Sequence, residues 1–250
     1  MKAAQYWDSR EAVGMYAHAP GLLRAEAAAL AFCFPAGLSG MSFLDLGCGA
    51  GRTTAVLQAG GARVIGVDAS RALIHAARGL FPQIDFHVGR AEALTFDDAS
   101  FDCVLVAGNS LDYIESKDAR LQALREIRRV LRPDGWLVMS HHNMGAWLFK
   151  LPRWDALDHR LKHIFNGNIF RSECFVLEDD LLTGTQGILT YHAWSRQVIT
   201  DMHELGFDCA AVFANQGLLR AAQRLMRTAW LTKLAEVMPY YAFRRRVDGQ

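Results

Sequence analysis

Three glycines at alternate positions form the stretch of this 250-residue chain with the clearest chemical meaning. They are Gly47, Gly49 and Gly51, and they follow a short apolar run over residues 41–46. A helix-like segment, residues 52–58, comes directly after them. Because glycine has no Cβ atom, the backbone can turn tightly there and approach a ligand closely. A strand, a glycine turn and the free N–H groups of a helix N-terminus together predict a pocket for a polar ligand.

A carboxylate ends the second apolar run, residues 63–68. This carboxylate, Asp68, lies 21 residues after Gly47, close to the spacing of the acid that hydrogen-bonds a ribose in dinucleotide-binding folds. Two other nucleotide motifs fit less well. A P-loop needs a Lys-Ser/Thr pair after its last glycine, and here Arg52 and Thr53 follow. A nicotinamide fingerprint needs its third glycine where Arg52 stands, so a nicotinamide oxidoreductase is disfavoured.

Residues 44–52 and 64–70 resemble two motifs of the class I S-adenosylmethionine (SAM)-dependent methyltransferases, with looser similarity from about residue 41 to residue 143. The resemblance implies that the chain binds SAM and releases S-adenosylhomocysteine. It implies that the amino-acid end of the cofactor lies over Gly47 and Gly49, and that its ribose contacts Asp68. It also implies that further cofactor contacts come from Asp45, Cys48, Ala69, Ala91, Ala107 and Asn109.

The sequence departs from the family pattern at Arg90. Proteins that resemble this one usually have Gly-Asp-Ala here, and the acid reaches the adenine amino group. The departure leaves three interpretations open. The main chain and Glu92 hold the adenine, or the flat guanidinium of Arg90 stacks on the ring, or Arg90 is a solvent-facing charge.

The elements that must position these residues alternate between strands and helices. Apolar runs predict strands over residues 41–46, 63–68, 84–88, 101–106, 136–140 and 207–213. Apolar periodicity predicts helices over residues 22–34, 52–58, 71–80 and 116–131, and one from Ser195 that ends at Gly206. Such alternation requires right-handed crossovers and a parallel sheet.

We therefore expect an α/β fold with a doubly wound, seven-stranded Rossmann-like sheet and helices on both faces. The resemblance implies the strand order 3-2-1-4-5-7-6, with the last strand, near residues 239–246, inserted antiparallel. The chain reads as one methyltransferase domain over residues 1–250, with an N-terminal helical cap over residues 1–40. In the family such segments often cover the cofactor, while Tyr6, Trp7 and Tyr16 are equally consistent with packing on the sheet edge.

Residues 144–190 interrupt the alternating pattern. They are rich in aromatic side chains, with basic residues interleaved and poor periodicity. We interpret them as an inserted substrate lid with short elements, in which Trp147 contacts a planar or anionic acceptor. A packed accessory subdomain is the alternative.

The loop from Ala107 to Tyr113 follows the fourth predicted strand. Ligands in open α/β sheets lie beyond the carboxyl ends of the strands, so this loop should border the cofactor and the acceptor, with Tyr113 on the acceptor. Methyltransferases that act on nucleobase amines commonly carry Asn/Asp-Pro-Pro-aromatic here, and those that act on cytosine carbon carry Pro-Cys. Neither sequence is present.

Two adjacent histidines, His141 and His142, follow the fifth predicted strand. A histidine there is a candidate general base, and the following Asn143 is a candidate acceptor contact. Consecutive strand residues point to opposite faces, so only one of the two histidines should face the acceptor. We favour His142, which lies further past the strand end. A histidine that only caps the loop is the alternative, and no metal site is predicted because adjacent histidines diverge.

The composition limits the expected binding partners and the expected cellular compartment. The net charge is +1, so no global field favours nucleic acid. Five cysteines are scattered singly, which argues against a disulfide framework and favours a reducing cytoplasm. No apolar leader and no run of about 18 apolar residues occurs, so neither export nor stable membrane insertion is expected. The oligomeric state is not predicted.

These observations favour an enzyme that moves a methyl group from SAM to an oxygen or nitrogen atom of a small-molecule acceptor, in a biosynthetic or tailoring step. The sulfonium is already activated, so the protein mainly aligns the reactants, and a base is needed only for an acceptor with a high pKa. A protein methyltransferase and a noncatalytic SAM-binding protein remain the alternatives. The sequence does not identify the acceptor atom.

Overall fold

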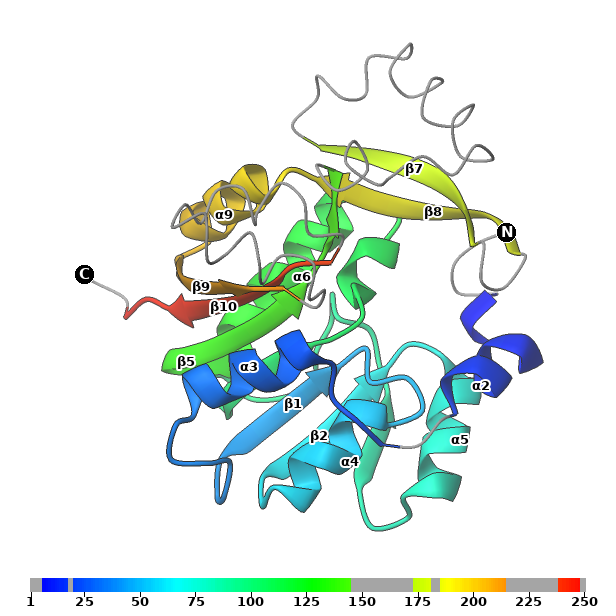
Figure 1. The fold of residues 1–250 in the computed structure, drawn as a ribbon, viewed down its shortest axis with the longest axis horizontal. Helices are drawn as coiled ribbons and strands as arrows, with labels where there is room; N and C mark the ends of the chain where they lie inside the picture. The colour runs from blue at the N-terminus through cyan, green and yellow to red at the C-terminus, as the bar shows by residue number, and fades with distance from the viewer. Residues whose placement is uncertain (1–5, 18–19, 145–172, 181–184, 215–237, 248–250) are drawn as a thin grey trace.

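The computed structural model describes residues 6–17, 20–144, 173–180, 185–214 and 238–247. Its centre is a seven-stranded sheet in the order β3-β2-β1-β4-β5-β10-β9, the order expected from the resemblance (Figure 1). The strands are β1 Ser42–Leu46, β2 Arg63–Asp68, β3 Asp85–Val88, β4 Phe101–Val106, β5 Leu131–Ser140, β9 Phe207–Phe213 and β10 Tyr240–Arg245. The first five pair in parallel, whereas β10 runs antiparallel to both β5 and β9. The predicted fold class is confirmed.

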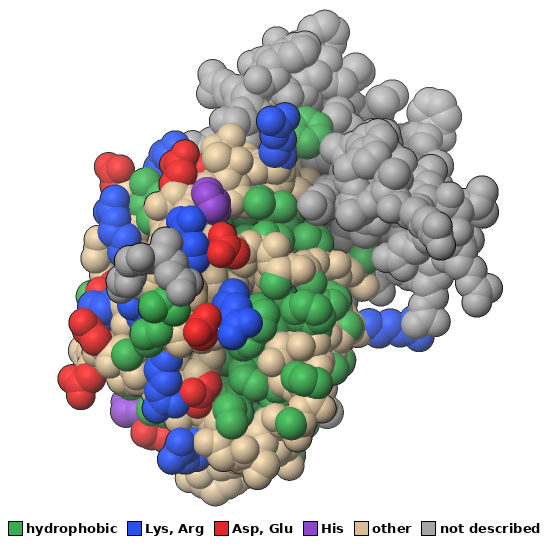
Figure 2. Space-filling view, turned by 90° about the vertical axis from the view of Figure 1, so that its left-hand side faces the viewer, with side chains coloured by type: hydrophobic (Ala, Val, Ile, Leu, Met, Phe, Trp, Pro, Cys, Tyr) green, Lys and Arg blue, Asp and Glu red, His purple; other side chains and the backbone are tan. Residues whose placement is uncertain are grey.

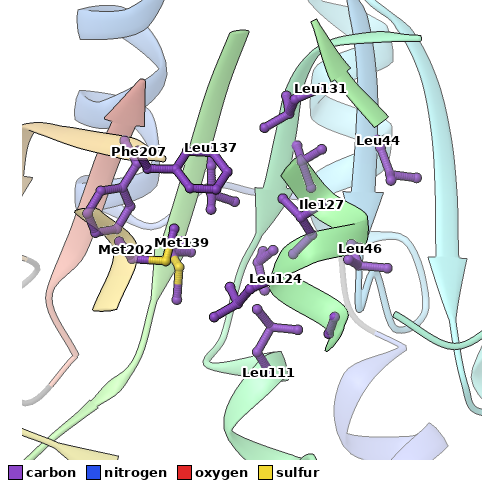
Figure 3. Close-up of a cluster of buried hydrophobic side chains, with 14 of the residues drawn as sticks. Leu44, Leu46, Leu111, Leu124, Ile127, Leu131, Leu137, Met139, Met202 and Phe207 are labelled. Atoms are coloured by element: carbon purple, nitrogen blue, oxygen red, sulfur yellow. The ribbon is translucent and has the colours of Figure 1, made fainter. Parts of the chain in front are cut away.

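Helices cover both faces of this sheet. One face carries α3 Arg24–Cys33, α4 Arg52–Ala59 and α5 Arg71–Leu80, and the other carries α6 Lys117–Val130 and α9 Ser195–Glu204. Alternate strand residues supply the two cores: Leu44 and Leu46 pack with α6, while Phe43 packs with α3. Figure 3 shows the α6 core, where Leu124 and Ile127 lie beside Leu44 and Leu46. The predicted helices and the helix end at Gly206 are confirmed.

Serine side chains begin two of these helices. Ser70 Oγ accepts a hydrogen bond from the Leu73 N–H at 3.1 Å at the start of α5. Ser116 Oγ accepts one from the Ala119 N–H at 3.1 Å at the start of α6. Each serine satisfies a backbone donor that has no partner inside the helix.

The start of β5 differs from the prediction. Residues 133–135 were expected to form a turn, with the strand starting at residue 136, but β5 begins at Leu131 directly after α6. Leu131 pairs with Phe101, and the register then shifts before Trp136 pairs with Cys103. Asp134 has φ +61° within this stretch. The turn residues are therefore absorbed as an irregularity inside the strand.

A second sheet of three strands lies beside the first, in the order β6-β8-β7. Its strands are β6 His142–Asn143, β7 Glu173–Asp180 and β8 Thr185–Ala193. Of the predicted lid, residues 145–172 and 181–184 lie outside the described residues. The described part is an antiparallel hairpin that continues to Ala193, and β8 pairs with β6. Figure 1 shows β7 and β8 above the end of the sheet toward which β1 points.

The described part of the predicted N-terminal cap, residues 6–17 and 20–40, contains the helices α2 and α3, which lie in different places. The helix α2 Arg10–Tyr16 packs against α5, near the carboxyl ends of the strands. The helix α3 packs against β9 and β10, on one face of the sheet. Only the first of the two therefore lies near the ends of the strands where ligands bind. None of the described helices is long and apolar enough to cross a bilayer.

Candidate functional site

A cavity of about 680 Å³ lies beyond the carboxyl ends of β1, β2 and β4. This volume falls within the range of about 300–1,000 Å³ that is usual for small-molecule sites. Its walls come from the glycine turn, from the ends of β2 and β4, from the loop after β3 and from α2. The predicted residues that line it are Gly47, Cys48, Gly49, Asp68, Ala69, Arg90, Ala91, Glu92, Ala107 and Tyr113.

The glycine turn has a backbone that only glycine adopts easily. Gly47 and Gly49 have φ values of +75° and +55°. A Cβ atom on Gly47 would lie 2.4 Å from the Ser110 Cβ atom, so glycine is required there for packing. A Cβ atom on Gly49 would have no atom within 4 Å, although Gly49 lines the cavity. The turn therefore closes against the loop after β4 and leaves room for a ligand beside Gly49.

Asp68 connects this turn to α5. Its Oδ2 accepts a hydrogen bond from the Gly49 N–H at 2.9 Å, and its Oδ1 accepts one from the Ser70 N–H at 2.8 Å. Burial raises the pKa of Asp68, and these two hydrogen bonds oppose the rise. Each carboxylate oxygen can accept more than one hydrogen bond. Asp68 is thus oriented at the cavity wall and still able to accept hydrogen bonds from two hydroxyls.

Asp45 has a supporting position. Its side chain is fully buried, and its Oδ2 accepts hydrogen bonds of 2.6 Å from both Thr53 Oγ1 and Thr54 Oγ1. Burial raises the pKa of Asp45 to about 6. Asp45 does not line the cavity. Instead of the predicted cofactor contact, it joins β1 to the first turn of α4 and so holds the glycine turn in shape.

Arg90 and Glu92 face each other at the cavity wall. Arg90 Nη2 lies 2.5 Å from Glu92 Oε1, and the side chain of Arg90 is 69% exposed while that of Glu92 is 15% exposed. Both residues line the cavity. In this arrangement Glu92 presents a carboxylate to the cavity, and stacking of Arg90 on a ligand would require the ion pair to open.

Aromatic side chains from two distant segments meet at the cavity. The ring centroid of Trp7 lies 5.0 Å from that of Tyr113 and 5.2 Å from that of Tyr16, all in edge-to-face contact. All three residues line the cavity, whereas Tyr6 is buried against Ala12 and Ile188. Trp7 and Tyr16 therefore lie where a bound ligand could contact them, whereas Tyr6 is packed in the core.

The N-terminal segment also forms hydrogen bonds at the side of the cavity where Asp68 lies. Ser70 Oγ donates a hydrogen bond of 2.8 Å to Asp8 Oδ1, and the Ala72 N–H donates to the same oxygen at 3.2 Å. Ser70 also donates its backbone N–H to Asp68. The first turn of α5 therefore connects Asp68 with the segment that carries Trp7.

A buried carboxylate on α3 connects three parts of the chain behind the glycine turn. Glu26 is fully buried and accepts hydrogen bonds from Arg52 Nη1 at 2.9 Å and from Arg52 Nη2 at 2.7 Å. Tyr240 Oη donates to Glu26 Oε1 at 2.7 Å and accepts from the Gly108 N–H at 3.1 Å. Burial raises the pKa of Tyr240, so the phenol keeps its proton. Through Tyr240, α3 and β10 hold the loop that follows β4.

His142 is paired with a carboxylate that the sequence analysis did not select. Its Nδ1 lies 3.0 Å from Asp112 Oδ2, and its backbone N–H donates to the same oxygen at 2.6 Å. Asp112 belongs to the short 3₁₀ helix η1 Ser110–Tyr113 and is fully buried. Its Oδ1 accepts a hydrogen bond of 2.7 Å from Arg120 Nη1. Burial alone would raise the pKa of Asp112, but Arg120 and His142 together hold it below its usual value.

His142 does not itself line the 680 Å³ cavity, but its ring contacts one that does. The ring centroids of His142 and Tyr113 lie 5.8 Å apart, in an edge-to-face arrangement. On its other side the His142 ring lies 5.0 Å from the ring of His192 on β8. The side chain is 18% exposed. His142 therefore lies in β6 of the second sheet, beside Tyr113 of the cavity wall and His192 of β8.

His141 lies between β5 and β6, and its side chain is in the core and does not line the cavity. It is fully buried, its ring stacks on Tyr241, and its Nε2 lies 2.8 Å from Tyr241 Oη. Burial lowers the pKa of His141 to about 4. The structure places His141 in the core, away from the cavity, because its ring packs against Tyr241 of β10.

Two further predicted residues, Asn109 and Asn143, do not line the cavity. Asn109 is buried with φ +58°, and its backbone N–H donates to Ser140 Oγ at 2.9 Å, so it shapes the loop after β4. Asn143 is buried in β6. Trp147 lies outside the described residues. Among the described cysteines, Cys33, Cys48, Cys103 and Cys209 are not in disulfides.

The buried imidazole of His141 should make stability depend on pH. Its folded pKa of about 4 lies below the ordinary value of 6.5, so the unfolded chain binds more protons between these values. We expect His141 to lower the free energy of unfolding by roughly 3 kcal/mol as the pH falls from 6.5 to 4. The raised pKa of Asp45 acts in the opposite sense, because it favours the folded state at low pH.

The measurement is therefore a difference between two proteins. Urea unfolding of wild type and His141→Gln is compared across this pH range, and the gap between them should narrow or reverse toward pH 4. A gap that stays constant with pH would contradict a neutral, buried His141. The exposed His87→Gln variant is the matched control, and its gap from wild type should not change.

Comparison with known proteins places these observations in context. Residues 43–135 match a family model described as "Methyltransferase domain". An uncharacterised methyltransferase from Synechocystis sp. is 36% identical over 115 residues, which cover 45% of this chain and 53% of that protein. A demethylmenaquinone methyltransferase from Clavibacter sepedonicus is 33% identical over 105 residues, 41% of each protein. The chain spans about half the length, or less, of these relatives.

Solved structures extend the similarity to most of the chain. A SAM-dependent methyltransferase from Methanosarcina mazei has a TM-score of 0.62 at 18% identity, over 84% of this chain and 94% of that one. The 1,6-didemethyltoxoflavin-N1-methyltransferase of Burkholderia thailandensis, solved with 1,6-didemethyltoxoflavin and S-adenosylhomocysteine, has a TM-score of 0.57 at 18% identity, over 90% of this chain and 79% of that one. At this level of identity the likeness concerns the fold.

Proposed function

We propose, from the premise that this chain carries a class I SAM-dependent methyltransferase domain, that it transfers the methyl group of SAM to an oxygen or nitrogen atom of a small, planar acceptor. The observation that carries the proposal is the cavity of about 680 Å³, which combines the glycine turn and Asp68 with the aromatic side chains of Trp7, Tyr16 and Tyr113. The glycine turn and Asp68 suit a nucleoside with an amino-acid tail, and the aromatic side chains suit a flat ring.

The residues of the cavity fit SAM. The open space beside Gly49, where no atom lies within 4 Å of a Cβ position, suits the amino-acid end. Asp68 can accept hydrogen bonds from the ribose hydroxyls, and Ala91 and Glu92 can border the adenine. When bound, SAM supplies a methyl group already activated on a sulfonium. The chain's own contribution is to bind, to orient the acceptor and to exclude water.

We assign His142 as the base that removes the acceptor's proton. A hydroxyl or amine with a high pKa reacts faster when a base removes its proton as the new bond forms. His142 contacts Tyr113, which we place beside the acceptor ring. An acceptor that already carries a free lone pair would not need this base.

A small acceptor is favoured over a macromolecule. Two relatives have names that specify small molecules, demethylmenaquinone and 1,6-didemethyltoxoflavin. The net charge is +1, and Figure 2 shows acidic and basic side chains interspersed on the described part of one face. Such a surface offers no single-sign field for nucleic acid. We assign the protein to the cytoplasm, which suits the thiols of Cys33, Cys48 and Cys103.

The experiment that tests the function uses SAM labelled in its methyl group. The protein is incubated with the label and either the low-molecular-mass fraction or the protein fraction of a bacterial extract, and products are separated and identified by mass spectrometry. Label in a small planar product supports the proposal. Label only in protein favours a protein methyltransferase, and binding of SAM without transfer in either fraction favours a noncatalytic SAM-binding protein.

Asp68→Ala should weaken SAM binding without unfolding the protein. The variant loses hydrogen bonds between the ribose and a charged acceptor, worth about 1.5–3 kcal/mol, which is a rise in Kd of about 10–150-fold. Isothermal titration calorimetry with SAM measures the change, and NADH should not bind either protein. The control is Asp97→Ala, an exposed carboxylate outside the cavity, which should bind SAM as wild type does. Undiminished affinity in Asp68→Ala would remove this residue from the site.

A further inference from the structure

We infer that Asp112 is a positioning residue for His142: it holds the imidazole through Nδ1, so that Nε2 is the nitrogen that receives the acceptor's proton. The inference deepens the proposed function and rests on it, because His142 is assigned as the base there. It adds two residues, Asp112 and Arg120, that contact neither of the proposed reactants. Both are fully or almost fully buried.

The geometry fixes the orientation of the ring. One oxygen of Asp112, Oδ2, lies 2.6 Å from the backbone nitrogen of His142 and 3.0 Å from its Nδ1. Two groups of the same residue thus converge on one acceptor, which limits rotation of the side chain about the backbone. The rings of Tyr113 and His192 also contact the His142 imidazole, with centroids 5.8 Å and 5.0 Å from its own. The imidazole has little freedom to turn its other nitrogen toward Asp112.

The charge of Asp112 fixes the tautomer. An ionised carboxylate can only accept hydrogen bonds, so Nδ1 of His142 must carry the proton in the neutral ring. The lone pair that can take a proton is then on Nε2. Arg120 keeps the carboxylate ionised in the core, since its Nη1 lies 2.7 Å from the second oxygen, Oδ1. Arg120 is itself held over the face of the Tyr191 ring, with Cζ 3.8 Å from the centroid.

The charged and titratable groups around His142 are few among the described residues. Asp112 and Tyr113 face it from η1, His192 faces it from β8, and His141 precedes it in the chain with its ring stacked on Tyr241. Arg120, from α6, acts through Asp112. Asp112 is the only carboxylate among these described groups, so loss of its charge removes the anion that lies beside Nδ1 of His142.

The step balances as a simple displacement. The acceptor atom forms a bond to the methyl carbon while the bond between that carbon and sulfur breaks, and the electron pair stays on sulfur to give the neutral thioether of S-adenosylhomocysteine. The acceptor's proton moves to Nε2 of His142. The resulting imidazolium is stabilised by the carboxylate of Asp112, and the proton later leaves to solvent.

The decisive experiment needs no acceptor. Long-range proton–nitrogen correlation spectra of isotope-labelled protein report which imidazole nitrogen carries the proton, and the signals of His142 are assigned by their loss in His142→Gln. We expect protonated Nδ1 in wild type. In Asp112→Ala no acceptor remains beside Nδ1, so Nδ1 should lose its preference for the proton and Nε2 should become the main site of protonation in the neutral ring. Asp112→Glu should restore part of the wild-type preference for a proton on Nδ1.

Asp112→Ala leaves the charge of Arg120 in the core without its carboxylate, so the double variant Asp112→Ala/Arg120→Met serves as a second test. Its tautomer should also differ from wild type. An unchanged wild-type tautomer in whichever of these variants is folded would overturn the inference. A changed tautomer supports it, even if the methyl-transfer assay finds no product, an outcome that would refute the proposed function alone.

A second readout separates positioning from a merely structural role. With the acceptor found by the labelled-SAM screen, Asp112→Asn should lower kcat by about 10²-fold or more and leave the Kd for SAM unchanged. The acid limb of the pH–rate profile should move to lower pH. Equal losses in kcat and SAM affinity would contradict a role confined to the orientation of His142.

Discussion

His142→Gln is expected to lower kcat by about 10²–10⁴-fold, the loss that follows removal of a general base and equal to roughly 3–5 kcal/mol of activation free energy. Glutamine can still donate a hydrogen bond to Asp112, so the surrounding structure should be kept. The pH–rate profile is the measurement. Wild type should show an acid limb, where protonation of His142 removes the base, and the variant should show none.

His141→Gln is the matched comparison. It removes an imidazole one residue away that lies in the core against Tyr241, so the acid limb should stay in that variant. SAM affinity, measured by calorimetry, should be unchanged in His142→Gln, because this residue lies outside the cofactor part of the cavity. Wild-type rates and an unaltered acid limb in both variants would mean that catalysis rests on alignment alone.

Glu26→Gln should produce the largest loss of stability among these variants. The substitution leaves Arg52 without its buried counter-charge, and a broken buried ion pair costs about 3–5 kcal/mol. The side chain of Arg52 is 32% exposed, so solvent offsets part of this and we expect about 3 kcal/mol. Urea unfolding should show a lower midpoint with an unchanged dependence on denaturant.

The same variant should also bind SAM less tightly, because Glu26 holds both Arg52, at the glycine turn, and Tyr240, which binds the Gly108 N–H. The exposed Glu11→Gln is the control for a lost carboxylate on an N-terminal helix, and it should change neither quantity beyond a few tenths of a kcal/mol. A Glu26→Gln protein as stable as wild type would show that the network contributes no net free energy.

The cofactor side of the cavity could be predicted from the sequence because its parts are local. A glycine turn lies between a strand and the helix that follows it, and Asp68 ends the next strand, so both follow from short stretches of chain. The sheet order followed from the resemblance to the class I methyltransferases, whose strand order this sheet shares. The start of β5 was missed because Pro133, Asp134 and Gly135 are typical turn residues that here lie inside a strand.

The proposed acid–base pair of His142 and Asp112 could be predicted only in part. His142 was found from its place after a strand, but its partner Asp112 lies 30 residues earlier and meets it only because β4 and β5 are neighbours. Arg120 was not among the predicted site residues. It is buried, four positions before Leu124 and on the same face. A cation on a buried helix face was the one signal that could have revealed the pair.

The hydrogen bonds from Ser70 and Ala72 to Asp8 have a consequence for how ligands leave the cavity. They attach the segment that carries Trp7 to the same helical turn that orients Asp68. Separation of that segment from α5 would remove Trp7 from the cavity wall. By reciprocity, whatever stabilises the segment in this position also raises the affinity for a ligand bound beneath it. Turnover would then be paced by reopening rather than by methyl transfer whenever the chemical step is the faster of the two.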